Sequence, residues 1–235
     1  MKRAIVIGAT SGIGRALAGR LAAEGYRVGV TGRREALLEE LAASLEQMAS
    51  AIRFRRETLL EELAATRPDS FCYAAADIMD PAAACAALER LAGELGGLDL
   101  CVVSAGTGDL NPGLDYALEE PAIRTNVVGW TAAVDWAYGR FEGQGGGHLV
   151  VISSVGGLRG SGAAPAYNAS KAYQINYAEG LRQRVAKSGL PVTITDIRPG
   201  LVDTAMAKGE GLFWVQPVAK TVRQILPAVE RRRHV

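Results

Sequence analysis

Residues 3–14, Arg3-Ala4-Ile5-Val6-Ile7-Gly8-Ala9-Thr10-Ser11-Gly12-Ile13-Gly14, decide the fold of this chain. The apolar run 3–7 is typical of a buried strand, and the residues after Gly14 follow a helical pattern. Between strand and helix, the glycines permit close backbone approach, and the helix start supplies unpaired N–H groups and a positive dipole end. The stretch therefore predicts a cradle for a pyrophosphate. The alternative is a tight strand-to-helix turn that only requires small residues.

Two arginines follow the next apolar run, residues 27–31, in the stretch Gly32-Arg33-Arg34, where no carboxylate stands. In a dinucleotide fold this point faces the adenosine ribose. An acidic residue there would accept from the 2′-hydroxyl, whereas an arginine matches a 2′-phosphate. The pair predicts NADP(H) over NAD(H), with Arg33 the leading contact and Arg34 the second. The alternative is a solvated pair at a helix start.

Strand-like and helix-like segments alternate along the whole chain. The apolar runs lie near residues 3–7, 27–31, 71–76, 99–104, 148–153 and 192–197. Such alternation predicts an α/β fold, a Rossmann-type doubly wound parallel sheet with helices on both faces. Ligands bind at the carboxyl ends of such strands, so we expect one crevice lined by the residues that follow each run: Gly8, Arg33, Asp77, Gly106, Ser154 and Pro199.

A phenol and an ammonium stand four residues apart in Tyr167-Asn168-Ala169-Ser170-Lys171, a segment that reads as helix. This spacing puts both side chains on one face. A nearby cation favours the phenolate, so the pair is typical of a tuned general acid/base, although a solvated helix face is the alternative. Ser153 and Ser154 close a strand run before Tyr167, and a strand end and the following helix can bring these groups together.

In their order, these stretches resemble the short-chain dehydrogenase/reductase family from residue 3 to about residue 208. The resemblance implies reversible hydride transfer between NADP(H) and a carbonyl or alcohol substrate. The implied catalytic residues are Asn126, Ser154, Tyr167 and Lys171, with Ser153 one residue off the family's spacing. The implied cofactor contacts are Gly8, Thr10, Ser11, Gly12, Ile13, Gly14, Arg33, Arg34, Asp77, Ile78, Ala105, Gly106, Tyr167, Lys171, Pro199, Gly200 and Thr204, with no metal.

The resemblance also assigns a role to each catalytic group. Tyr167 would exchange a proton with the substrate oxygen, and Ser154 would hydrogen-bond the same oxygen. Lys171 would lower the tyrosine pKa and grip the nicotinamide ribose, and Asn126 would support a water chain that resupplies protons. The chain departs from the family at Ile7, usually Thr, and at Val103-Ser104, usually Asn-Asn. Polar contacts around those turns are therefore in doubt.

A tandem repeat separates the second and third strand runs. Residues 33–43 recur as residues 55–65, with ten of eleven positions identical at a spacing of 22. No glycine or proline occurs between Arg33 and Arg67, and apolar residues keep helical spacing, so an overlong helix or a helical hairpin is expected to project from the domain. Arg55 becomes a rival to Arg33 for the phosphate if the first copy loops out.

Composition fits one domain spanning residues 1–235. The net charge of +1, from 26 basic and 25 acidic residues, calls for no nucleic acid. Three cysteines without metal-ligand spacing suggest a reducing compartment, and the apolar run at residues 4–7 is too short for a signal or a membrane span, so a cytoplasmic protein is expected.

Three further expectations concern assembly, function and the carboxyl end. The helical segments near 115–141 and 165–187 predict a homodimer or homotetramer, because apolar residues lie at several angles: Trp130, Val134, Trp136, Tyr173, Ile175 and Leu181. The alternative function is a non-catalytic NADP-binding sensor, or an interaction protein. Phe213 and Trp214 are expected either to line a pocket or to anchor the last helix. The family's seventh strand would begin at His234-Val235, so either the sequence is truncated or the sheet ends early.

Overall fold

The computed structural model describes residues 1–57, 71–207 and 213–235, with the backbone alone for residues 48–57. Its parallel sheet has the order β3-β2-β1-β4-β5-β6. The strands are β1 (Arg3–Ile7), β2 (Arg27–Gly32), β3 (Phe71–Ala75), β4 (Leu100–Val103), β5 (Gly147–Ile152) and β6 (Val192–Ile197). Each lies within one residue of its expected bounds, and the doubly wound Rossmann-type fold is confirmed. The strand order reverses between β1 and β4, which is where such sheets bind ligands.

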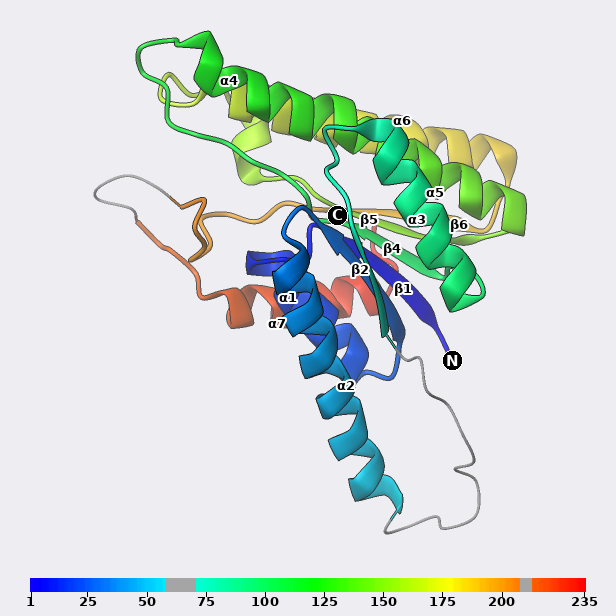
Figure 1. Cartoon of the computed structure of the whole chain (residues 1–235). Helices are drawn as coiled ribbons and strands as arrows, with labels where there is room; N and C mark the ends of the chain where they lie inside the picture. Colours follow the sequence, from blue (N-terminus) through cyan, green and yellow to red (C-terminus); the bar gives the residue numbers. More distant parts are fainter. Residues whose placement is uncertain (58–70, 208–212) are drawn as a thin grey trace.

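Helices cover both faces of the sheet (Figure 1). On one face lie α1 (Gly12–Ala23), α2 (Glu35–Glu57) and α7 (Val218–Glu230). On the other lie α3 (Pro81–Leu95), α4 (Tyr116–Ile123), α5 (Trp130–Gln144) and α6 (Pro165–Ser188). The alternation of side chains along β1 shows how the layers form: Ile5 and Ile7 join the core under α3, α5 and α6, whereas Ala4 and Val6 join the core under α1, α2 and α7.

A π-helical segment, η1 (Arg124–Gly129), joins α4 to α5 without a break. The sequence predicted one regular helix near residues 115–141 and missed this widened turn. Such π-turns insert an extra residue and are frequent at functional sites. Here the segment carries Asn126. A second irregular piece, the 3₁₀-helix η2 (Val155–Leu158), follows β5.

The expected overlong helix is confirmed as far as Glu57. Figure 1 shows α2 running from the sheet outward, well past the end of its neighbour α1. Arg55 stands 20 residues beyond the start of α2 at Glu35, which is about 30 Å along the helix axis. The first copy of the repeat is therefore the one beside the sheet. The remainder of the second copy, from residue 58, and the hairpin alternative lie outside the described residues.

The side chains expected to drive assembly are largely interior. Trp130 and Val134 are completely buried in the core under α5, and Leu181 is buried with them. Trp136 is partly buried and donates its indole N–H to Glu89 of α3 at 3.1 Å. The prediction that these side chains form a surface for assembly was wrong. Helix α5 packs against α3 and α6 as well as against the sheet, so several of its faces are interior.

The carboxyl end lies along β6. The backbone N–H of Asp196 donates to the carbonyl of His234 at 3.0 Å, so the last residues occupy the edge where the resemblance placed a seventh strand. Phe213 and Trp214 stack on each other with ring centroids 5.4 Å apart and are 75% and 84% exposed, so neither expectation for them holds. Within the described ranges, no helix is long and apolar enough to cross a membrane.

Candidate active site

The turn after β1 forms a compact cradle. Gly8 and Gly12 have φ of +85° and +56°, a left-handed backbone that side chains disfavour. A Cβ at Gly14 would lie 2.2 Å from the Gly8 carbonyl oxygen, so position 14 has no room for any side chain. A Cβ at Gly12 would lie 3.2 Å from Cγ2 of Thr204, which shows that the loop after β6 lies against the cradle.

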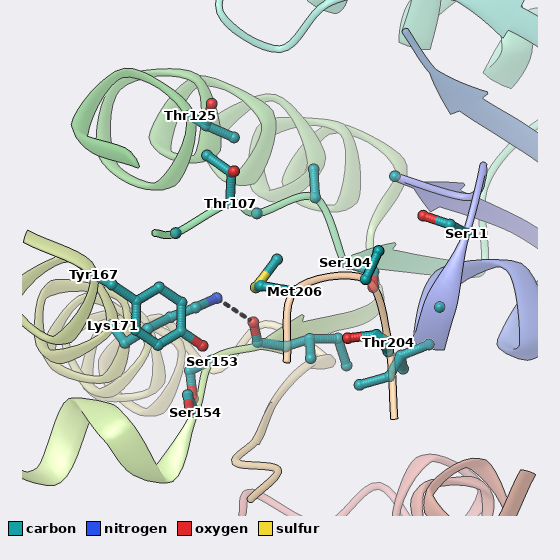
Figure 2. A pocket seen from close by; sticks show the side chains of 18 of the residues that line it. Ser11, Ser104, Thr107, Thr125, Ser153, Ser154, Tyr167, Lys171, Thr204 and Met206 are labelled. Atoms are coloured by element: carbon teal, nitrogen blue, oxygen red, sulfur yellow. Dashed lines mark hydrogen bonds between the residues drawn. The ribbon is translucent and has the colours of Figure 1, made fainter. Parts of the chain in front are cut away.

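A cavity of about 720 Å³ extends from this cradle along the carboxyl ends of the strands. Every expected cofactor contact except Gly14 lines it, and three of the four expected catalytic residues do so: Ser154, Tyr167 and Lys171. The structure thus brings together side chains from the loops after all six strands. Figure 2 shows Ser11 of the cradle and Thr204 at one side of this space and Tyr167 with Lys171 at the other.

The two arginines after β2 have different surroundings. Arg34 donates to Oγ1 of Thr10 at 2.8 Å and to Oγ of Ser11 at 3.2 Å, which ties it to the cradle. Arg33 is exposed, lines the cavity, and has no hydrogen bond or ion pair to any residue that the structure describes. The Arg33 guanidinium is therefore available to a ligand.

Tyr167 and Ser154 lie near each other in the lining of the cavity (Figure 2). Burial raises the pKa of Tyr167 above its ordinary value, and a hydrogen bond from Ser154 lowers that pKa by a smaller amount. Ser153, in contrast, donates its hydroxyl to the buried carboxylate of Asp196, which also pairs with Arg198 at 2.6 Å. The two adjacent serines thus have separate partners, and Ser154 is the one beside the phenol.

Lys171 does not lower the pKa of Tyr167 in the way the sequence predicted. Its Nζ lies 5.9 Å from the centre of the Tyr167 ring and donates to the carbonyl of Ile152 at 2.9 Å, the dashed line in Figure 2, and to Oε1 of Gln174 at 2.9 Å. The ammonium is thus directed at neutral oxygens rather than at the phenol. Burial lowers the pKa of Lys171 to about 8, and the negative charge of Asp196 opposes that shift.

Asn126 lies behind the cavity wall rather than in it. Its Oδ1 accepts from the backbone N–H of Thr107 at 2.9 Å, and its Nδ2 donates to the carbonyl of Thr107 at 2.7 Å and to Oγ of Ser170 at 2.9 Å. Its own carbonyl accepts from Nε2 of Gln174 at 2.9 Å. These groups all bond to protein atoms, and the water chain expected at Asn126 stays a prediction. The Asn126 side chain instead clamps the loop after β4 to α6.

Three residues of the site were missed by the sequence analysis. A Cβ at Gly108 would lie 2.3 Å from Cδ2 of Tyr167, and one at Gly157 would lie 2.6 Å from the backbone of Lys171. These glycines let two loops approach α6, and their positions follow no short motif. The third is Gln174, one helical turn after Lys171, which a search for polar side chains on the reactive face would have found.

The residues present fit a phosphate-bearing dinucleotide. The cradle leaves no room for side chains, and the amino end of α1 presents backbone N–H groups beside it. Thr31, which also lines the cavity, has a buried hydroxyl oxygen without a hydrogen-bond partner in the described structure. Within the described residues, no group of three or more His, Cys, Asp or Glu is placed to hold a metal ion.

Comparisons with known proteins agree with this geometry. The short chain dehydrogenase family model matches residues 2–57 and 50–212, two pieces that meet at the repeat. An uncharacterised oxidoreductase of Mycobacterium tuberculosis (strain ATCC 25618 / H37Rv) is 31% identical over 235 residues, covering 98% of this chain and 85% of that protein. An uncharacterised oxidoreductase of Myxococcus xanthus (strain DK1622) is 36% identical over 210 residues, covering 87% of this chain and 74% of that protein.

The solved structures extend the likeness to the fold. A short-chain dehydrogenase from Sphingobium yanoikuyae, in complex with NADPH, superposes with a TM-score of 0.82 at 24% sequence identity. The superposition covers 99% of this chain and 85% of that one. The six-stranded sheet and its flanking helices therefore have the same arrangement in the two proteins.

Proposed function

This chain belongs to the short-chain dehydrogenase family, an assignment that supports NAD(P)-dependent oxidoreduction, and on that premise we propose a more specific activity. The protein transfers hydride reversibly between NADP(H) and the carbonyl or alcohol carbon of a small-molecule substrate. The observation that carries the proposal is the convergence of Tyr167, Ser154 and Lys171 on one cavity that begins at the glycine cradle. The proposed compartment is the cytoplasm, whose reducing conditions suit three free cysteines.

The cofactor would be held along the whole cavity. Its pyrophosphate would meet the Gly8–Gly14 turn and the amino end of α1, and Asp77 would stand near the adenine. Arg33, without a partner among the described residues, would pair with the 2′-phosphate. When bound, the nicotinamide supplies or accepts the hydride, which the side chains of the protein cannot do.

The chain's own groups manage the proton and the charge on oxygen. Tyr167 would hold the transferable proton at its phenolic oxygen, and the raised pKa keeps that oxygen protonated at neutral pH, as reduction of a carbonyl requires. Ser154, already hydrogen-bonded to the phenol, would donate to the same substrate oxygen. Lys171 would contribute its charge beside the nicotinamide ribose. Gly108 and Gly156 would let the substrate-side loops lie close to the ring.

The test is NADPH oxidation, followed by its absorbance, against a panel of aldehydes and ketones. Substrate-dependent loss of NADPH supports the proposal. A non-catalytic sensor would bind NADPH tightly but would turn over no carbonyl. It would also reduce no NADP⁺ with the matching alcohols. An interaction protein would show a partner that is lost on deletion of residues 33–54 while cofactor binding persists.

A further inference from the structure

Gln174 is completely buried on α6, and its side-chain amide joins two parts of the active site. Its Oε1 accepts from Nζ of Lys171 at 2.9 Å, and its Nε2 donates to the carbonyl of Asn126 at 2.9 Å. The first contact lies within α6, and the second crosses to the π-helical segment η1. One amide thus spans the distance between the lysine ammonium and a backbone carbonyl.

Both partners of this amide depend on it. Lys171 is buried, and its other protein acceptor is the carbonyl of Ile152. The Asn126 side chain is committed to Thr107 and Ser170, and Gln174 bonds to the backbone carbonyl of Asn126, which takes no part in those contacts. A buried donor or acceptor that loses its partner is strongly disfavoured, and more so when it is charged.

We propose that Gln174 is a positioning residue of the active site, whose amide fixes the Lys171 ammonium relative to Asn126 and to the loop that Asn126 clamps. This inference rests on the proposed oxidoreductase activity, in which Lys171 acts beside the cofactor. An amide donates and accepts hydrogen bonds but has no ionisable proton near neutral pH. The bridge therefore fixes the ammonium in place, whereas the water chain that the sequence predicted at Asn126 would relay protons.

Few charged groups of the described residues lie near Lys171, so a shift in its titration can be assigned to a single substitution. Asp196 of β6 raises its pKa and is itself paired with Arg198. Tyr167 lies on the same helix, with its ring centre 5.9 Å from Nζ. On η1 the charged residue is Arg124, which is exposed and lies 3.8 Å from Glu120.

Two substitutions at Gln174 test the two hydrogen bonds of its side-chain amide. Gln174→Glu keeps an acceptor for Lys171, adds a negative charge and removes the donor to Asn126. Gln174→Met keeps a side chain of similar length and removes both hydrogen bonds. Gln183→Met, at an exposed site nine residues further along α6, is the matched control. The chain has five lysines, so the ¹³Cε resonance of Lys171 is assigned by its loss in Lys171→Met.

The experiment follows that resonance with pH in the unliganded protein and measures kcat and KM for NADPH oxidation. We expect the Lys171 titration to move up by about one pH unit or more in Gln174→Glu and down by a similar amount in Gln174→Met, with no change in the control. We also expect kcat to fall about tenfold or more in Gln174→Met, with Gln174→Glu retaining more activity than Gln174→Met.

An unchanged titration in Gln174→Glu would overturn the inference, and so would wild-type kcat in a folded Gln174→Met protein. Should Gln174→Met fail to fold, the isosteric Glu variant decides the question by its titration alone. The titration needs neither cofactor nor substrate. A protein that turns over no carbonyl but shows the expected titration shifts would therefore refute the proposed function and leave the bridge between Lys171 and Asn126 established.

Discussion

Burial moves the pKa values of Tyr167 and Lys171 in opposite directions. The pKa of the phenol rises and that of the ammonium falls to about 8, because an apolar surrounding disfavours the charged form of either group. At neutral pH both groups therefore remain protonated, and the phenol is in the form that donates. In the proposed function, this is the protonation state that carbonyl reduction requires.

Replacement of Tyr167 by Phe tests the proton donor directly. We expect turnover to fall by about 10²- to 10⁴-fold, because the substitution removes the proton donor. The ring can still pack against Gly108, so the rest of the site should keep its shape. NADPH affinity, measured by fluorescence titration, should stay nearly constant. Tyr116→Phe, at an exposed tyrosine, is the control and should behave as the unmodified protein. Unchanged turnover in Tyr167→Phe would contradict the assigned role.

Replacement of Arg33 by Ala tests cofactor choice. We expect NADPH to bind about ten- to hundredfold more weakly, since a guanidinium–phosphate pair contributes roughly 1.5–3 kcal/mol, while NADH affinity hardly changes. Arg34→Ala should weaken both cofactors alike, because Arg34 supports Thr10 and Ser11 of the cradle. Arg55→Ala should change neither affinity. A selective loss of NADPH in Arg55→Ala would instead give the phosphate to the second copy of the repeat.

At the scale of elements, η1 packs tightly against the loop after β3. A Cβ at Gly129 would lie 2.0 Å from the carbonyl oxygen of Ile78. We expect Gly129→Ala to destabilise the protein by about 1–3 kcal/mol, because backbone must shift to admit the methyl group. Gly139→Ala, in α5 with open space around it, should stabilise by about 0.5–1 kcal/mol. Urea unfolding of both variants measures the difference in their stability. Equal unfolding midpoints would show that the backbone around Gly129 accommodates a methyl group without loss of stability.

The pairing of β5 with β6 should make stability depend on pH. His148 of β5 is buried, and its Nε2 lies 2.8 Å from Oγ1 of Thr195 on β6. Burial, with a smaller contribution from the positive charge of Arg232, lowers the His148 pKa from 6.5 to about 4. The unfolded chain therefore binds a proton first as pH falls. The stabilisation is complete above pH 6.5 and decreases between pH 6.5 and 4 by up to about 3 kcal/mol.

Thermal unfolding across this pH range measures the effect. In His148→Gln the amide can keep the contact to Thr195 without titrating, so we expect the fall in melting temperature between pH 6.5 and 4 to become shallower. His234, whose side chain is exposed, is the matched site for a control substitution to Gln. The same slope in His148→Gln and the unmodified protein would assign the acid sensitivity to other groups.

Periodicity in the sequence predicts the regular elements and fails at the irregular one. Buried parallel strands are short apolar runs between turn residues, so all six could be placed. The widened turn of η1 depends on contacts such as Gly129 against Ile78, which are distant in sequence and follow no local pattern. The burial of Trp130 and Val134 could not be foreseen for the same reason, since α5 acquires two helical neighbours only when the fold is complete.

At the scale of the molecule, a homodimer or homotetramer remains our prediction, on different residues from those first chosen. Exposed apolar side chains lie along α4 and η1 at Leu118, Ile123 and Val128. We expect light scattering at micromolar concentration to give at least twice the 24.7 kDa chain mass, and Val128→Asp to shift the mass toward the monomer. Asp at exposed Gly143 should leave the mass unchanged. A monomeric mass for the unmodified protein would contradict the prediction.

The expected site residues come together because the topology places the end of every parallel strand at one edge. Sequence order and the family resemblance together predicted that Ser154, Tyr167, Lys171 and Arg33 share one crevice, and all four line the cavity. It could not foresee that Lys171 would turn toward Gln174, or that Asn126 would lie behind the wall. Those details depend on which hydrogen-bond partners a buried group meets after packing, and a linear motif does not encode them.

The spacing of the repeat matches the phase of an α-helix. A step of 22 residues at 100° per residue makes about six full turns with only about 40° left over. Glu57, the last residue of α2, therefore stands on nearly the same side of the helix axis as Glu35, its counterpart in the first copy, so an added stretch of this length keeps the phase of a helix. An addition of 20 residues would instead change the phase of a helix by about 200° and turn its apolar stripe to the opposite side.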